Sequence, residues 1–124
     1  MSAKQPLVIN HSFREHENGL PKQKLRQATE YIQVHLGEDL SLSEIANELG
    51  MSQYYFCHLF KRSTGMSPHQ YLIQQRVERA KHLLEQPERT ITAISLECGF
   101  ANQSHFAKCF RKHTGMNPKQ FRKL

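Results

Sequence analysis

The stretch TGMSPHQY at residues 64–71 returns as TGMNPKQF at residues 114–121, in a chain of 124 residues. Internal repetition of this kind identifies the unit from which a chain is built. A unit of about 50 residues lies near the lower limit for an independent hydrophobic core. We therefore expect two small copies that share part of their structure.

The residues before the first stretch predict two short helices around a turn. Ser41 and Glu44 have the spacing of a capping box, and Ser52 can cap the second helix. Gly50 interrupts the apolar pattern and Gly65 ends it. Two helices joined by a short turn that contains glycine are typical of a helix-turn-helix.

The second copy preserves the turns and the apolar positions of the first, with one extra residue in its turn. The matched pairs are Ile45 and Ile94, Gly50 and Gly99, Phe56 and Phe106, Phe60 and Phe110, Gly65 and Gly115, and Pro68 and Pro118. The repeated ending therefore predicts another helix, capped by Asn117 and started by a proline.

Two further helices flank the first copy. The earlier one has apolar residues at helical spacing, and Gly37 ends its run as a C′ glycine would. The later one starts at Pro68, with Ser67 and Gln70 placed for a capping box. It is expected to run to about Gln86, before a proline that forbids continuation. About 18 residues at 1.5 Å each give a rod of about 27 Å.

These patterns predict an all-α chain in four parts. The parts are a flexible arm or linker remnant at 1–20, a first helix-turn-helix subdomain at 21–66, a long linker helix at 67–87 and a second helix-turn-helix subdomain at 88–124. The first part is assigned in this way because it shows no sustained periodicity.

The charge balance favours a polyanionic partner. Lys and Arg number 17 against 11 Asp and Glu, for a formal net charge of +6. Acidic residues are missing between Glu48 and Glu78 and again after Glu97. A solvated basic face is the alternative explanation of the charge.

Cysteine content and hydropathy favour a cytoplasmic protein that has no membrane partner. The three cysteines are an odd number without disulfide-framework spacing, which suits a reducing compartment. No apolar run approaches the ~20 residues of a membrane span. The first residues also lack the apolar segment of a signal peptide.

The second helix of each predicted pair has one buried and one exposed side. Opposite the phenylalanines lie Tyr54, Cys57, His58 and Lys61 in the first copy, and Ser104, Ala107, Lys108 and Arg111 in the second. The buried sides agree in residue type, whereas the exposed sides agree only at the basic pair Lys61 and Arg111. Two different faces on one scaffold are expected if each reads a different stretch of an asymmetric target.

Double-stranded DNA suits such a pair of helices. Its major groove admits an α-helix, and its base edges pair with Lys, Arg, Ser, Gln and His side chains. Phosphate contacts would fall to the helix N-termini and to Lys61, Arg62, Arg111 and Lys112. A rod of about 27 Å is comparable with the ~34 Å of one DNA turn, so one chain could fill two successive major grooves.

The segment from Glu44 to Leu84, followed by GFANQSHFAKCFRKHTGMNPKQFR at 99–122, resembles the DNA-binding domain of the AraC/XylS family of bacterial transcription regulators. The match covers about residues 22 to 122. The resemblance implies seven helices, two helix-turn-helix subdomains joined by a linker helix, sequence-specific binding to double-stranded promoter DNA, and often contact with RNA polymerase. Members commonly carry a separate sensing domain, so we expect this chain to be a fragment of a longer regulator rather than a stand-alone one.

By position, the resemblance assigns base reading to Tyr54, Cys57 and His58 in the first copy and to Gln103, Ser104, Ala107 and Lys108 in the second. Cys57 and Ala107 would offer at most apolar contact with a thymine methyl group. Ala80 matches a packing position of the linker helix. The resemblance leaves Arg76 open between a structural role and a phosphate contact.

Some of these side chains also allow other interpretations. His105, Cys109 and His113 have a spacing that could present three ligands to zinc, but Cys109 and His113 align with core-facing positions, which favours packing. His58 could make a pH-sensitive contact, although an ordinary hydrogen bond is favoured. Oxidation sensing by Cys57 is disfavoured because no basic or N-terminal placement beyond its own helix argues for a lowered pKa. The phenylalanines could stack on bases, but their helical spacing favours the core.

Two other classes of function compete with sequence-specific DNA binding. One is an enzyme or sensor that uses thiol and imidazole groups, and it lacks a phosphate loop, paired carboxylates or a Ser-His-Asp arrangement. The other is indiscriminate coating of nucleic acid, which needs no pair of distinct faces. We therefore expect no enzymatic activity and no cofactor.

Overall fold

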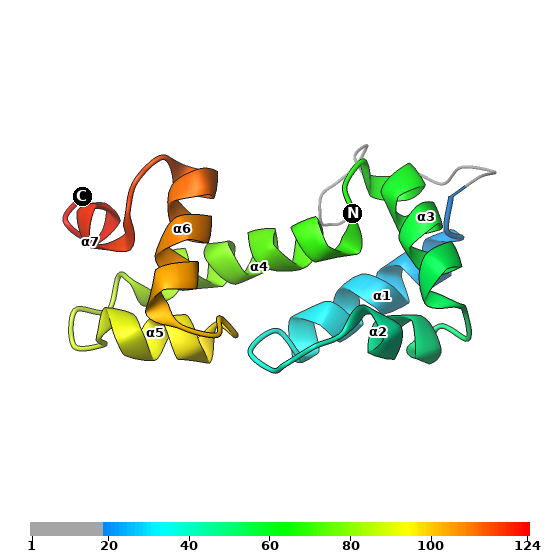
Figure 1. The fold of residues 1–124 in the computed structure, drawn as a ribbon, viewed down its shortest axis with the longest axis horizontal. Coiled ribbons are helices and arrows are strands. Elements are labelled where there is room, and N and C mark those ends of the chain that lie inside the picture. Colours follow the sequence, from blue (N-terminus) through cyan, green and yellow to red (C-terminus); the bar gives the residue numbers. More distant parts are fainter. Residues whose placement is uncertain (1–18) are drawn as a thin grey trace. The chain divides into compact units, whose positions relative to one another are not determined.

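The computed structural model describes residues 19–124, and over this range the chain forms seven α-helices and no strand (Figure 1). The helices are α1 (Lys22–Val34), α2 (Leu42–Glu48), α3 (Gln53–Thr64), α4 (Pro68–Leu83), α5 (Ile91–Glu97), α6 (Gln103–Thr114) and α7 (Pro118–Arg122). The predicted all-α fold with seven helices is confirmed. Residues 1–18 of the predicted arm lie outside the described range. None of the seven helices within residues 19–124 has the length and hydropathy needed to span a bilayer.

The described chain divides into two compact units. The first unit consists of residues 19–34 and 40–71, and the second of residues 35–39 and 72–124. The segment that follows α1 therefore packs with the second unit. α4 contributes its first turn to the first unit and its remaining residues to the second.

The core of the first unit is built around the buried side of α3. Phe56 and Phe60 are fully buried, with ring centroids 5.6 Å apart, and Phe60 meets Tyr71 edge-on at 5.5 Å. Leu20 is fully buried as well, and its N–H donates to Ser63 Oγ at 2.8 Å. Leu20 therefore belongs to this unit and not to the arm, which was expected to extend to residue 20.

The core of the second unit is built in the same way around α6. Phe106 and Phe110 are fully buried, with ring centroids 5.5 Å apart, and Phe121 of α7 meets Phe110 at 5.3 Å. The remaining buried residues of this cluster are Ile73, Val77, Ala80, Leu84, Ile94, Cys98 and Phe100. Ala80 has the packing role expected for it.

The helix starts follow the predicted capping chemistry. Ser52 accepts a hydrogen bond from the N–H of Tyr55 at the start of α3. Reciprocal capping boxes form before α2, α4 and α7, where each cap side chain and the side chain three residues later bond to the other's N–H. The pairs are Ser41 with Glu44, Ser67 with Gln70, and Asn117 with Gln120.

The repeated TGM sequence forms the same hydrogen-bonded turn at the end of α3 and of α6. Thr64 Oγ1 lies 2.9 Å from the carbonyl oxygens of Phe60 and Met66, and it accepts from the N–H of Met66 at 3.2 Å. Thr114 makes the equivalent contacts at 2.8, 3.0 and 3.1 Å. The glycine after each threonine has a φ of 81°, a left-handed conformation that favours glycine.

Two helix ends differ from their predictions. α4 ends at Leu83 and not at Gln86, because the N–H of Gln86 bonds to the carbonyl of Leu83 in a tighter turn. Gly37 is not a left-handed cap, since the glycines with positive φ within the described range are elsewhere. A Cβ at Gly37 would instead lie 2.5 Å from the carbonyl oxygen of Glu97, so the position is small because α5 passes close to it.

The sequence left Arg76 open between a structural role and a phosphate contact, and the structure gives it the structural role. Its side chain is 8% exposed, and it donates from Nε to the Leu36 carbonyl at 3.0 Å and from Nη2 to the Glu38 carbonyl at 2.8 Å. These bonds fix the segment 35–39 to α4 within the second unit. Gly99 leaves the room for them, because a Cβ there would lie 2.7 Å from both Arg76 Nε and the Leu36 oxygen.

Replacing Gly99 with alanine should destabilise the second unit strongly. Gly115 is the matched control, because it also has positive φ but a Cβ there would meet nothing within 4 Å. We expect Gly115→Ala to lower the free energy of unfolding by about 1–2 kcal/mol through backbone strain alone. Gly99→Ala should lower it by about 1–3 kcal/mol more, because the added methyl displaces Arg76. Denaturant unfolding measures both, and equal losses would contradict the role given to this contact.

Candidate nucleic-acid interface

The exposed side of α3 carries the four residues predicted for it. Tyr54 is 81% exposed, His58 and Lys61 are exposed, and Cys57 is half-buried. The rings of Tyr54 and His58 are stacked, 6.3 Å apart with an interplanar angle of 6°. These side chains form one continuous face because the buried phenylalanines occupy the other side of the helix.

A shallow groove of about 430 Å³ lies along this face. It is lined by Tyr54, Cys57, His58, Lys61, Arg62 and Ser67. The groove thus brings together the predicted base-reading residues of the first unit and its predicted phosphate-binding pair, Lys61 and Arg62. Ser67, which caps α4, was not predicted as part of the face.

The exposed side of α6 is more polar than that of α3. Ala107 is half-buried, and the other predicted residues of this face are exposed. They are Gln103, Ser104, Lys108, Arg111 and Lys112. Among the described residues, the face therefore offers an amide, a hydroxyl, a methyl group and three cations.

The four predicted phosphate-binding cations have no ion-pair partner among the described residues. The ion pairs among residues 19–124 are those of His35 with Glu38, Lys81 with Glu78, and Arg89 with Glu97. None involves Lys61, Arg62, Arg111 or Lys112, which occupy the last turns of α3 and α6. A cation there is stabilised by the helix dipole and stays available to an anionic partner.

Gln103 is the residue of the α6 face whose side chain has a fixed partner. The Thr92 hydroxyl donates to Gln103 Oε1 at 2.5 Å, across the turn between α5 and α6. Thr92 was missed by the sequence reasoning. The repeat carried a signal for it, since its aligned residue in the first copy, Ser43, also has a hydroxyl group.

The possible zinc ligands on α6 do not converge. Cys109 packs against the core of the second unit, with its Sγ 3.5 Å from His105 Nε2, but His113 is exposed. The prediction that His113 faces the core was wrong, because its counterpart Ser63 is buried by contact with Leu20, which lies outside the repeated segment. Within residues 19–124, no three His, Cys, Asp or Glu side chains are grouped to hold a metal ion.

Comparison with known proteins identifies similar chains. Residues 45–124 match the family model described as a helix-turn-helix domain. The Msm operon regulatory protein of Streptococcus mutans is 34% identical over 90% of this chain and 40% of its own length. A helix-turn-helix transcriptional regulator of Staphylococcus aureus is 35% identical over 92% of this chain and 15% of its own length. The chain thus spans less than half of either curated relative.

Solved structures agree with the fold. The crystal structure of a transcriptional regulator of the AraC-type DNA-binding class from Chromobacterium violaceum superposes with a TM-score of 0.77, at 33% identity over 82% of this chain and 91% of its own. The DNA-binding domain of the global transcriptional factor AdpA, solved with a target DNA, gives a TM-score of 0.76. Its identity is 30% over 81% of this chain and 90% of its own.

The Cys57 thiol should react slowly at neutral pH. Partial burial raises its pKa above the ordinary thiol value, so the reactive thiolate is scarce below that value and its fraction grows as the pH rises. The rate of iodoacetamide alkylation at Cys57, followed by peptide mass spectrometry, should still be climbing above a pH of about 8.5, where an unstructured cysteine peptide is half ionised. A rate that levels off below the midpoint of the peptide would contradict this and revive oxidation sensing.

Proposed function

The chain belongs to the AraC-type helix-turn-helix transcription regulators, and we propose that it binds a specific, asymmetric sequence of double-stranded promoter DNA through α3 and α6. In this proposal each of these two recognition helices enters a major groove, and the two grooves are neighbours on one duplex. The observation that carries it is that matched scaffolds expose different side chains on the two helices, with unneutralised cations beside both faces.

Base reading is assigned to the N-terminal half of each exposed face. The residues are Tyr54, Cys57 and His58 on α3, and Gln103, Ser104, Ala107 and Lys108 on α6. The α3 face has an apolar groove with an imidazole, which suits thymine methyl groups and a single hydrogen bond. The α6 face has an ammonium and an amide, which suit acceptors on base edges.

Phosphate contact is assigned to the cations beside these faces, Lys61 and Arg62 on α3 and Arg111 and Lys112 on α6. Such contacts orient a protein on the duplex and make its affinity depend on salt, but they carry no sequence information. Membership of this family also makes RNA polymerase a candidate partner at a promoter. The greater length of the curated relatives makes a sensing domain a candidate companion of this chain.

Thiol chemistry is a weaker alternative for this chain. Burial raises the pKa of Cys57 and Cys109 above the ordinary value, and it raises the pKa of Cys98 to about 11. Nucleophilic and redox-sensing cysteines need the opposite shift, because the thiolate is the reactive form. The cysteines therefore favour packing and contact roles over catalysis.

A competition assay separates sequence-specific binding from indiscriminate coating. Duplexes of equal length and composition but shuffled sequence compete with a selected site for the full chain. Sequence-specific binding predicts affinities that differ by ~10³ or more at physiological salt. Equal competition by all duplexes would reject the proposed function.

Replacing Lys108 and replacing Arg111 should have different consequences. Lys108→Ala should relax the preference at one base position by ~1–3 kcal/mol, because a base contact is lost. Arg111→Ala should weaken binding to all sequences alike and make the slope of log K against log salt shallower by about one unit. Titrations of each variant against a set of single-base variants of the site, at several salt concentrations, measure both effects. Uniform losses from both substitutions would show that the division of roles is wrong.

A further inference from the structure

The hydrogen bond between Thr92 and Gln103 joins the two helices of the second helix-turn-helix. Thr92 is the second residue of α5 and Gln103 the first residue of α6. Both side chains are exposed, and the hydroxyl and Oε1 lie 2.5 Å apart. The proposed function places Gln103 at a base edge, so this bond orients a side chain that would contact a base.

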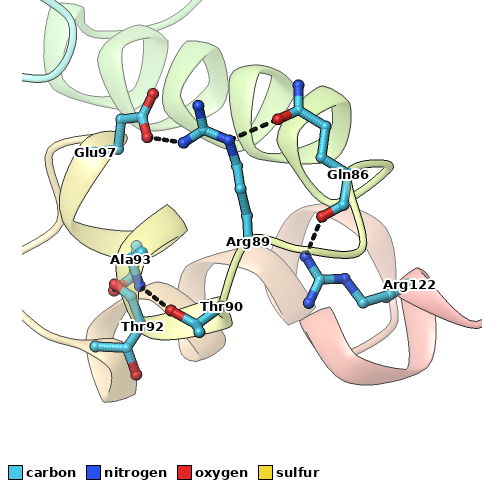
Figure 2. Close-up of polar contacts among 8 residues, drawn as sticks. Gln86, Arg89, Thr90, Thr92, Ala93, Glu97 and Arg122 are labelled. Carbon is cyan, nitrogen blue, oxygen red and sulfur yellow. Dashed lines mark hydrogen bonds and ion pairs between the residues drawn. The ribbon is translucent and has the colours of Figure 1, made fainter.

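The start of α5 is held firmly, so the Thr92 hydroxyl has a defined position. Figure 2 shows Thr90 Oγ1 accepting from the N–H of Ala93, at 3.0 Å, and Arg89 bonded both to Gln86 and to Glu97. The carbonyl of Thr92 itself accepts from the Ser95 hydroxyl at 2.7 Å. The cap and these side-chain bonds fix the first turn of α5.

The turn that leads into α5 is held by the C-terminal helix as well. Arg122 of α7 donates to the carbonyl oxygens of Leu84 and Gln86, each at 3.2 Å, and the bond to Gln86 is drawn in Figure 2. The side chain of the same Gln86 accepts from Arg89 Nε at 2.6 Å. The start of α5, which carries Thr92, is thus held by its own cap and by the bonds of Arg122 to the turn that precedes it.

In the structure the Gln103 amide has its oxygen turned to the Thr92 hydroxyl, and this orientation sets which end of the amide can meet a ligand. With the amide oxygen turned to the hydroxyl, the amide nitrogen and its two N–H donors remain, and no described residue accepts from them. A free glutamine can present an acceptor and a donor together, as in its paired contact with adenine N6 and N7. Gln103 held in this way presents donors.

We propose that Thr92 is a positioning residue that makes Gln103 a donor and gives the second unit a preference for a keto base. This inference rests on the proposed function. Guanine O6 and thymine O4 are acceptors in the major groove, whereas adenine and cytosine carry amino donors at the corresponding places. The contacted base is therefore guanine or thymine.

The first unit lacks this bond and supplies a matched control. Ser43 aligns with Thr92 and Gln53 with Gln103, but Ser43 Oγ lies 3.2 Å from Ser41 Oγ and has no bond to Gln53 among the described residues. The turn between α5 and α6 is one residue longer than the turn between α2 and α3. A hydroxyl residue and a glutamine thus occupy equivalent positions in both units, but among the described residues they are hydrogen-bonded to each other only in the second unit.

The test measures base preference with the full chain and a site selected from random duplexes. Gln103→Ala first locates the contacted base, which is the position where this variant loses discrimination. Duplexes with each of the four bases at that position are then titrated with the wild type and with Thr92→Val, Thr92→Ser and Ser43→Ala. Thermal unfolding of every variant separates an effect on reading from an effect on folding, and Thr92→Ala replaces Thr92→Val if the valine variant does not fold.

The wild type should bind keto bases about 10-fold more tightly than amino bases at the located position. Thr92→Val should reduce this ratio to about 2-fold or less, or favour adenine, because the freed amide can rotate. Thr92→Ser keeps the hydroxyl and should keep the ratio, and so should Ser43→Ala.

Three results would overturn the inference while leaving the proposed function intact. The first is that a folded Thr92→Val variant keeps the keto preference, and the second is that the wild type prefers adenine or cytosine at the located position. The third is that Gln103→Ala leaves the base preference unchanged at every position of a selected site. Failure to select any site from random duplexes would instead overturn the proposed function, and the inference with it.

Discussion

Two pairs of buried phenylalanines determine what this protein can present to a partner. Phe56 and Phe60 on α3, and Phe106 and Phe110 on α6, have no exposed surface. Each pair lies one turn apart on a single side of its helix, and a phenylalanine lost from a core typically costs ~3–5 kcal/mol. Since a helix buried so strongly on one side cannot rotate, its opposite side must face solvent.

The two units keep this anchoring and vary what it exposes. The threonine hydrogen bonds in the turns after α3 and α6 differ in length by 0.1 Å, and both turns contain a left-handed glycine. The exposed sides differ in nearly every residue, and the turn before the recognition helix is one residue longer in the second unit. Constant anchoring with variable faces is the arrangement expected of a chain whose two helices read different sequences.

The sequence predicted the features that depend on neighbouring residues. Capping boxes such as Ser41 with Glu44, the phenylalanine stripes and the exposed face around Tyr54 follow from local spacing, and the structure contains them. Features that depend on distant segments were missed or misread. Gly37 is small because Glu97 lies beside it, and Arg76 is buried because it bonds to the carbonyl of Leu36. No local pattern encodes such approaches, and the assignment of individual side chains to bases stays a prediction.

Selection of bound duplexes from a random pool, using the full chain, tests whether α3 and α6 read one asymmetric site. We expect one enriched site with two unlike blocks of conserved bases, spaced by about one helical turn of ~10 base pairs and unrelated by two-fold symmetry. A palindromic site, a single conserved block, or a pool without enrichment would contradict it.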